Sequence, residues 1–206
     1  ERLELQYEMF KKNKNLIIIF SNVDWVDEKG RCLPSLFSHR LATSSEEIFY
    51  NLQFRNCLIH PTVVFNKKII VNKFEGYDER YEAEDNDLWL RVSKRYKIVK
   101  IDKILIKVRR SKQSKAASFK KVLNESIIII SQKNLQSLIG KHISADLVRI
   151  LADLNPLNYS PLKIKHALTI LEQLNIKILQ QSPPFLDKEK IRRTSEYKKN
   201  TLRIYL

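Results

Sequence analysis

The pattern of hydrophobic and polar positions predicts a chain whose first part mixes strands with helices and whose last part is helical. The segment NLIIIFSNVDWVDEKGR contains a continuous apolar run, which predicts a buried strand and a second extended run that turns at residues 28–30. Alternation in YKIVKID and KILIKVRR predicts further strands. Residues 62–65 are also strand-like, and they follow a turn-prone His60-Pro61 pair.

Two helices are predicted in the same part of the chain, one before the first strand and one after it. The segment ERLELQYEMFKKN places Leu3, Tyr7 and Phe10 on one stripe. No capping residue precedes this helix, so we expect further residues upstream of it. Ser44, followed three residues later by Glu47, forms a capping-box pattern that predicts the start of the second helix.

From about residue 118 the pattern is helical throughout. We expect one or two helices that end at Gly140, a helix that begins after Ser144, and a long helix in SPLKIKHALTILEQLNIKIL. The long helix carries one apolar stripe, formed by Ile164, Ala167, Leu168, Leu171, Leu174 and Ile178. These patterns divide the chain into a mixed domain over residues 1–117 and an all-α helical domain over residues 118–206.

Composition narrows the class of protein. The chain has 206 residues, 43% of them hydrophobic, with only three glycines and six prolines, as expected for a folded globular protein. No apolar run is long enough to cross a bilayer. Two cysteines are too few for a disulfide framework, which favours a reducing cytoplasm. The formal net charge of +15 predicts an anionic partner: nucleic acid, a phosphorylated substrate or a membrane surface.

An acidic stretch, YDERYEAEDNDLWLRV, interrupts this basic chain at residues 77–92. It leads into a predicted helix over about residues 84–96, in which Asp85 shares a face with Leu88 and Trp89. Acids at a helix start stabilise the helix through its macrodipole, typically by about 0.3–1 kcal/mol. A carboxylate held there beside an aromatic wall also stays ionised, which suits a general base. The residues alone leave both roles open.

The order of these segments resembles the acceptor-side half of family 2 glycosyltransferases, which have the GT-A fold. The segments that carry the resemblance cover about residues 1–110, and they are RLELQYEMFKKN, a strand pair with a DEKG turn, EEIFYNLQFRNCLIHPTVVFNKKII, GYDERYEAEDNDLWLRV and KILIKVRR. The resemblance implies an α/β fold, in which a partial GT-A (nucleotide-diphospho-sugar transferase) domain precedes the all-α domain. It implies an inverting transfer of a sugar from a nucleotide-diphospho-sugar to a saccharide or lipid-linked saccharide acceptor, in cell-surface polysaccharide or glycan synthesis.

The resemblance also assigns catalytic residues. Asp85 matches the general base of the family's Glu-Asp motif and would take a proton from the acceptor hydroxyl. Glu84 would hold the acceptor or orient Asp85. Trp89 would pack beneath them and contribute to the substrate-binding surface.

Three further residues are expected to contact substrate. His60 matches a family segment that borders the acceptor and donor cleft, although a histidine before a proline is often only a turn residue. Arg91 would support the site by pairing with an acid. The alternative is that Arg91 is an exposed helical arginine without a role in the site. Arg109 matches an arginine at the end of a family strand and could meet phosphate charge. Ser111 stands where a family histidine is common, which departs from the pattern.

The family's nucleotide-binding strands and its Asp-X-Asp metal motif lie upstream of the segment that matches residues 2–6. We therefore expect a divalent metal, Mn or Mg, for the complete enzyme, with its main ligands outside this chain and no metal ligand within it. We also expect this chain alone to be inactive and to bind nucleotide sugars poorly.

Two other functions stay open. A basic nucleic-acid-binding module would explain the high isoelectric point of about 9.8 and the basic residues near the end of the chain. The acids of residues 78–87 would repel phosphate, however, so nucleic acid is the less expected partner. A non-catalytic scaffold with a degenerate transferase fold would fit the departure at Ser111. We expect a cytoplasmic protein whose tail, residues 188–203, attaches peripherally and electrostatically to the anionic inner membrane face.

Overall fold

The computed structural model describes residues 1–13, 16–34, 42–111, 119–152 and 159–206. Within these ranges a three-stranded sheet has the order β2-β1-β3. The central strand β1 (Leu16–Val26) pairs in parallel with β3 (Lys97–Arg109) and antiparallel with β2 (Val64–Phe65). The mixed α/β character predicted for the first part of the chain is therefore confirmed.

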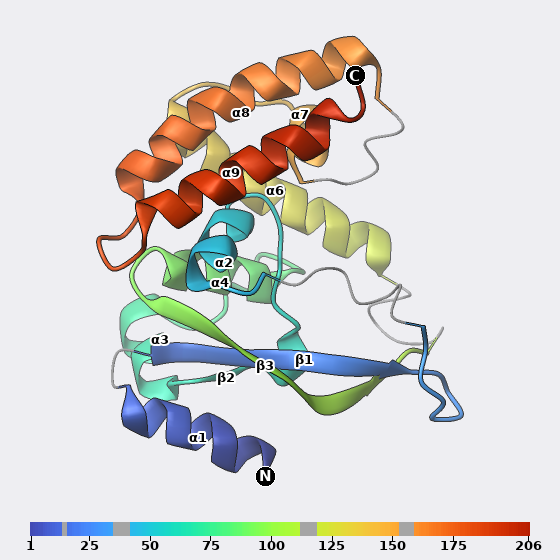
Figure 1. The fold of residues 1–206 in the computed structure, drawn as a ribbon, viewed down its shortest axis with the longest axis vertical. Coiled ribbons are helices and arrows are strands. Elements are labelled where there is room, and N and C mark those ends of the chain that lie inside the picture. The colour runs from blue at the N-terminus through green and yellow to red at the C-terminus, as the bar shows by residue number, and fades with distance from the viewer. Residues whose placement is uncertain (14–15, 35–41, 112–118, 153–158) are drawn as a thin grey trace.

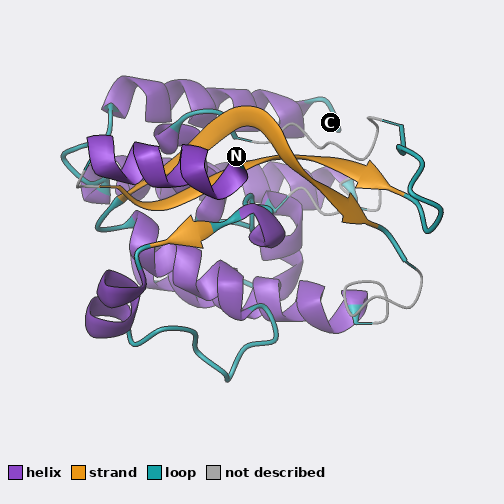
Figure 2. Ribbon diagram, turned by 90° about the horizontal axis from the view of Figure 1, so that it is seen from below, coloured by secondary structure: helices purple, strands orange, loops and turns teal. Residues whose placement is uncertain are grey.

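The strands β1 and β3 are each continuous, whereas the sequence suggested two shorter extended runs in place of each. In β1 the run through Ile18 and Phe20 is buried on one face of the sheet, and Ile19 is buried on the other. Irregular register on either side of Asn22 lets β1 and β3 stay paired to their ends. An apolar run without alternation is typical of a strand covered on both faces, and helices do cover both faces here (Figures 1 and 2).

Helix α1 (Arg2–Lys12) covers one face of the sheet, but with a different side from the one predicted (Figure 2). Leu3 and Tyr7 are exposed, so the predicted stripe is wrong at these two positions. The cause is Gln6, which is buried because its Nε2 donates a hydrogen bond of 2.9 Å to the carbonyl oxygen of Thr62. The apolar residues that pack on the strands are Leu5, Met9 and Phe10.

Helices α2 (Ser45–Leu52) and α4 (Glu84–Ser93) cover the other face of the sheet. The start of α2 is as predicted, because Ser44 Oγ accepts a 3.1 Å hydrogen bond from the Glu47 backbone N–H. The Glu47 carboxylate accepts a hydrogen bond from the backbone N–H of Thr43, 2.7 Å away, so a second donor before the helix is also satisfied.

Helix α3 (Lys67–Phe74) was not predicted. It follows β2 directly, and the side chain of Asn66 caps it by accepting the Ile69 backbone N–H at 3.2 Å. It ends at Glu75, which adopts a left-handed conformation with φ of 59°. Its Ile70 is buried against the same core as α4.

The described residues after 118 form four helices, which pack on the side of α2 away from the sheet (Figure 1). They are α6 (Lys120–Ile139), α7 (Ala145–Leu151), α8 (Pro161–Gln181) and α9 (Lys188–Arg203). The predicted stop at Gly140 is confirmed, with φ of 68° in the left-handed region. The predicted stripe of α8 is also confirmed. Its buried members are Ile164, Ala167, Leu171, Leu174 and Ile178.

The predicted boundary between residues 117 and 118 lies outside the described residues. On either side of it, side chains share one core: Phe49 and Tyr50 of α2 belong to the same buried cluster as Leu171 of α8 and Ile191 of α9. Tyr50 also donates a buried hydrogen bond of 2.8 Å to Asn175 of α8. The helices after residue 118 are therefore packed directly on the α/β part.

One buried amide can be tested for its cost. Both polar atoms of the Asn86 side chain in α4 are buried and have no hydrogen-bond partner among the described residues. Because such an amide costs about 1–3 kcal/mol, we expect Asn86→Leu to raise the free energy of unfolding by an amount of that order. Urea unfolding followed by circular dichroism measures this change.

Asn175→Leu is the matched control, since Asn175 is also buried but is paired with Tyr50. That substitution should lower the free energy of unfolding, because it removes the buried hydrogen bond that Tyr50 donates to Asn175. A loss of stability in Asn86→Leu similar to that of the control would show that the Asn86 amide does have a partner.

Candidate active site

The acids predicted to carry chemistry lie in the first turn of α4. The helix begins at Glu84 as predicted and ends at Ser93, three residues earlier than expected. Its N-cap residue, Ala83, has no capping side chain; instead its backbone N–H donates to Ser126 Oγ of α6 at 3.1 Å. The start of α4 is thus fixed by the helical part of the chain.

The carboxylate of Asp85 is held by three surrounding groups. Its Oδ2 accepts a 2.9 Å hydrogen bond from Asn56 Nδ2 and lies 3.6 Å from His60 Nδ1. Its Oδ1 accepts the backbone N–H of Asn86 at 2.7 Å. The side chain remains 16% exposed. A carboxylate offers about four lone-pair positions, so Asp85 can still accept a proton or hydrogen bond from a molecule on its exposed side.

His60 is placed beside Asp85 by a short 3₁₀ helix, η2 (His60–Thr62). The turn is tied to α1, because Arg2 donates to the carbonyl oxygen of Pro61 at 3.0 Å and Gln6 donates to that of Thr62. It is tied to β1 as well, because Thr62 Oγ1 accepts the backbone N–H of Ser21 at 3.1 Å. These bonds fix the backbone that carries the imidazole.

The second ring nitrogen of His60, Nε2, lies 3.2 Å from the hydroxyl of Tyr77. Burial raises the pKa of Tyr77, and the negative charges of Asp85 and Glu84 raise it further, so the phenol keeps its proton at neutral pH. Because the carboxylate of Asp85 can only accept, we expect the imidazole proton on Nδ1, which faces it, and the Tyr77 hydroxyl as the donor to Nε2.

Trp89 is fully buried under this group. The rings of His60, Phe65 and Tyr77 lie 5.8, 6.2 and 6.2 Å from its ring. Its Nε1 has no hydrogen-bond partner in the described part of the chain. The indole thus supports the rings of the site from the protein core. The substrate contact predicted for Trp89 stays a prediction, and because the indole is buried, Trp89 would influence a substrate through the positions of His60 and Tyr77.

Glu84 and Arg91 lie on α4 with Asp85 but differ in their surroundings. Glu84 is half-buried and close enough to Tyr77 for its charge to raise the pKa of the phenol. Arg91 pairs with Asp87 at 2.7 Å and donates to the carbonyl oxygens of Phe74 and Gly76. Arg91 therefore holds the end of α3, and its predicted contact with substrate remains untested.

Arg109 is not brought together with the other predicted residues. It is exposed and pairs with Val26 in the sheet, whereas Phe65, beside the site, pairs with Ile18. Eight residues of β1 separate these two levels, which corresponds to about 26 Å along the strand. Ser111, in turn, donates to the Glu28 side chain at 3.1 Å.

Two residues of the site had no assigned role in the sequence. Asn56 comes from the loop after α2, 29 residues before Asp85, and no spacing signal links the two. Tyr77 belongs to the acidic stretch, and its role depends on the imidazole it meets in three dimensions. The neighbouring Cys57 is no nucleophile, because burial raises the pKa of its thiol to about 12.

The described residues do not test the metal that the resemblance implies, because its main ligands are expected outside this chain. No group of three or more His, Cys, Asp or Glu side chains within them is arranged to hold an ion. The expectation of Mn or Mg with ligands elsewhere stays untested, and no chemical step is assigned to a metal below.

Two curated glycosyltransferases are similar to this chain. It is 34% identical over 91 residues to the O-antigen biosynthesis glycosyltransferase WbnJ of Escherichia coli, a match that covers 44% of this chain and 34% of that protein. It is 29% identical over 112 residues to an uncharacterized glycosyltransferase of Methanocaldococcus jannaschii, which covers 53% and 37%. No protein-family model matches the chain. The chain spans about a third of the length of these relatives, and the similarity supports a glycosyltransferase role.

The hydrogen-bond pattern predicts the tautomer of His60. In its neutral form the proton should lie on Nδ1, because the Tyr77 hydroxyl supplies the hydrogen to Nε2. Long-range ¹H–¹⁵N correlation spectra distinguish the two tautomers. His166, exposed on α8, is the internal reference. The double variant Tyr77→Phe, Asp85→Asn should move His60 towards the reference pattern, and an Nε2–H signal in the unaltered protein would contradict the arrangement.

Proposed function

We propose that this chain supplies the acceptor side of an inverting, GT-A-type glycosyltransferase in which Asp85 is the general base. The observation that supports it most directly is the Asp85 carboxylate, oriented by Asn56 and His60 and still open on one side. The similarity to two glycosyltransferases supports the same reaction class.

In the proposed reaction, Asp85 takes the proton of an acceptor hydroxyl as that oxygen attacks the anomeric carbon of the donor sugar. The bond from that carbon to the diphosphate oxygen breaks with its electron pair, and the nucleoside diphosphate leaves. Attack from the face opposite the leaving group inverts the configuration. Asp85 then releases the proton to water, which returns the carboxylate to its starting state.

The neighbours of Asp85 have positioning roles in this proposal. Asn56 donates a hydrogen bond to Oδ2 of Asp85, and Nδ1 of His60 lies 3.6 Å from the same oxygen, so both restrict the rotation of the carboxylate. Glu84 lies next to Asp85 at the start of α4, where it can accept a hydrogen bond from the acceptor. Arg109 would meet substrate at a separate level of the sheet.

The substrates follow from the reaction class. We propose a nucleotide-diphospho-sugar donor and a saccharide or lipid-linked saccharide acceptor. One similar protein is named for O-antigen biosynthesis, which favours cell-surface polysaccharide synthesis as the process. The alternative is a non-catalytic scaffold that keeps the fold of a transferase. Replacement of Asp85 distinguishes the two functions, because it should lower turnover only in an enzyme.

Replacement of the base is the direct test. We expect Asp85→Asn to lower turnover by about 10²–10⁴-fold, because the amide cannot take up the acceptor proton. The substituted side chain can still accept the Asn56 hydrogen bond, so the loss of stability should stay below about 1 kcal/mol. Turnover is measured on the complete enzyme, which includes the donor-binding part, as release of nucleoside diphosphate from uridine and guanosine diphosphate sugars with glycan acceptors.

Glu79→Gln is the matched control, since Glu79 is an exposed acid of the same stretch. It should leave turnover unchanged. Equal activity of Asp85→Asn and the control would remove Asp85 from the reaction. A large loss of stability in Asp85→Asn would assign it to the helix start alone.

We also propose a cytoplasmic location with electrostatic attachment to the anionic inner membrane face through α9. The helix buries Ile191 and Leu202 in the core and turns Lys188, Lys190 and Arg193 outwards. In the described ranges no helix combines the length and apolar character needed to span a bilayer. Each lysine or arginine near an anionic surface contributes about 1 kcal/mol of attraction.

Vesicle sedimentation tests this attachment. The chain should bind phosphatidylserine-containing vesicles at low salt and detach at high salt, because screening weakens the attraction. The double variant Lys188→Glu, Lys190→Glu should reduce binding, whereas Lys67→Glu, Lys68→Glu on α3 should have a smaller effect. No binding at low salt would discard the attachment, and preference for duplex DNA over vesicles would favour a nucleic-acid partner.

A further inference from the structure

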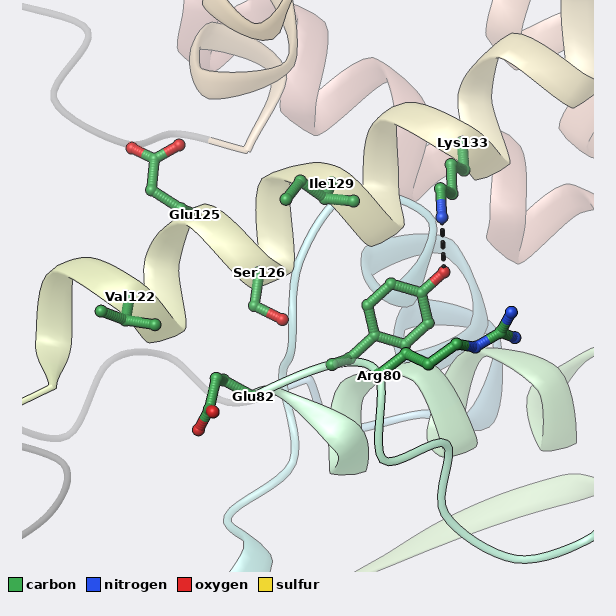
Figure 3. A pocket seen from close by; sticks show the side chains of 8 residues that line it. Arg80, Glu82, Val122, Glu125, Ser126, Ile129 and Lys133 are labelled. Carbon is green, nitrogen blue, oxygen red and sulfur yellow. Dashed lines mark hydrogen bonds between the residues drawn. The ribbon is translucent and has the colours of Figure 1, made fainter.

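A cavity of about 360 Å³ lies between α6 and residues 80–82, the segment that leads into α4 (Figure 3). It is open to solvent and does not include Asp85 in its lining. Its volume is at the lower end of the range of small-molecule sites, about 300–1,000 Å³. It can therefore hold a ligand of the size of one or two sugar rings.

The two walls of the cavity are fixed to each other. Ser126 of α6 accepts the backbone N–H of Ala83, and Lys133 of α6 donates to the Tyr81 hydroxyl at 2.9 Å. Lys133 Nζ also lies 5.0 Å from the centroid of the Tyr81 ring. A preformed wall costs a ligand less ordering on binding than a mobile one does.

The lining combines apolar and hydrogen-bonding surface. Val122 and Ile129 of α6 are 47% and 45% exposed and supply the apolar part of the lining. Glu82 and Glu125 supply carboxylates, and Arg80 and Lys133 supply cations, so the formal charges of the lining cancel. A balanced lining in a chain of net charge +15 does not select an anion.

Two charged groups of the lining are paired with residues outside it. Arg149 holds the Glu125 carboxylate through contacts of 2.7 and 2.9 Å. Arg80 is paired with Asp78 at 2.6 Å and holds the pKa of that carboxyl at about 2. Exposed aliphatic carbons beside hydrogen-bonding groups match a sugar ring, which has an apolar C–H face and a rim of hydroxyl groups.

The cavity lies near the proposed base. Glu82 and Asp85 are three residues apart, so their Cα atoms are separated by at most about 11 Å. Ala83 connects the two sites physically, because it is the N-cap of α4 and bonds to the cavity wall through Ser126. The separation of the two segments is therefore within the length of one short oligosaccharide.

We propose that this cavity binds an uncharged sugar residue of the acceptor, one or two residues away from the hydroxyl that reacts at Asp85. The identity of the ligand as an acceptor rests on the proposed transferase function, whereas the binding of a sugar ring rests on the lining alone.

NMR titration of the ¹⁵N-labelled full chain tests the cavity. The probes are the methyl glycosides of glucose, galactose, mannose, N-acetylglucosamine and N-acetylgalactosamine, with inorganic phosphate as the anion. At least one glycoside should shift the backbone amide signals of residues 80–83 and 122–133, and phosphate should not. Absence of such shifts with every glycoside, or the same shifts with phosphate, would overturn the proposal.

Ile129→Arg should abolish the glycoside shifts, because it places a long charged side chain in the cavity. Ile176→Arg is the matched control, since Ile176 is 57% exposed on α8 outside the cavity, and it should keep them. Shifts that survive in Ile129→Arg would also overturn the site. Asp85→Asn should retain the shifts, because Asp85 does not line the cavity. If the glycoside shifts are seen but Asp85→Asn keeps full turnover, the proposed function fails and this proposal of a sugar site stands. If turnover depends on Asp85 but no glycoside shifts the signals, this proposal fails and the proposed function stands.

Discussion

The indole of Trp89 is the surface on which the candidate site is assembled. His60 from η2, Phe65 from β2 and Tyr77 from the loop after α3 all place their rings against it. Because Trp89 is fully buried, its position is set by the packing of α4 against the sheet. Burial of a large aromatic side chain stabilises the fold more than the polar contacts of a partly exposed site do. The core of the α/β part therefore determines where the imidazole and the phenol lie relative to the first turn of α4.

The helical part of the chain completes this arrangement from the other side. Helix α6 meets the segment before α4 at both Ala83 and Tyr81, and its Ser131 donates to the carbonyl oxygen of Phe54 at 2.7 Å. The last of these bonds fixes the loop after α2, which carries Asn56. The donor to Asp85 and the start of the helix that bears Asp85 are thus both held by α6. A change in α6 is expected to affect the site without any direct contact with substrate.

Local signals in the sequence predicted the parts of the fold that local contacts determine. Ser44 and Gly140 were identified because a cap or a left-handed residue acts within one helical turn. The inward face of α1 was assigned wrongly because Gln6 is drawn in by a carbonyl group 56 residues away. The contact between Asn56 and Asp85 has the same non-local character. The predicted acid was therefore available from the pattern, but the side chains that orient it required the tertiary structure.

The two roles that the sequence left open for Asp85 fall on different oxygen atoms. Its Oδ1 accepts a backbone N–H of the first turn of α4, which is the contribution expected of an acid at a helix start. Its Oδ2 faces Asn56 and His60, two side chains that a helix start does not require. Stabilisation of the helix end would be complete without them. An amide and an imidazole beside Oδ2 restrict the direction of the carboxylate, which is what the proposed general base requires in order to meet a proton at a defined position.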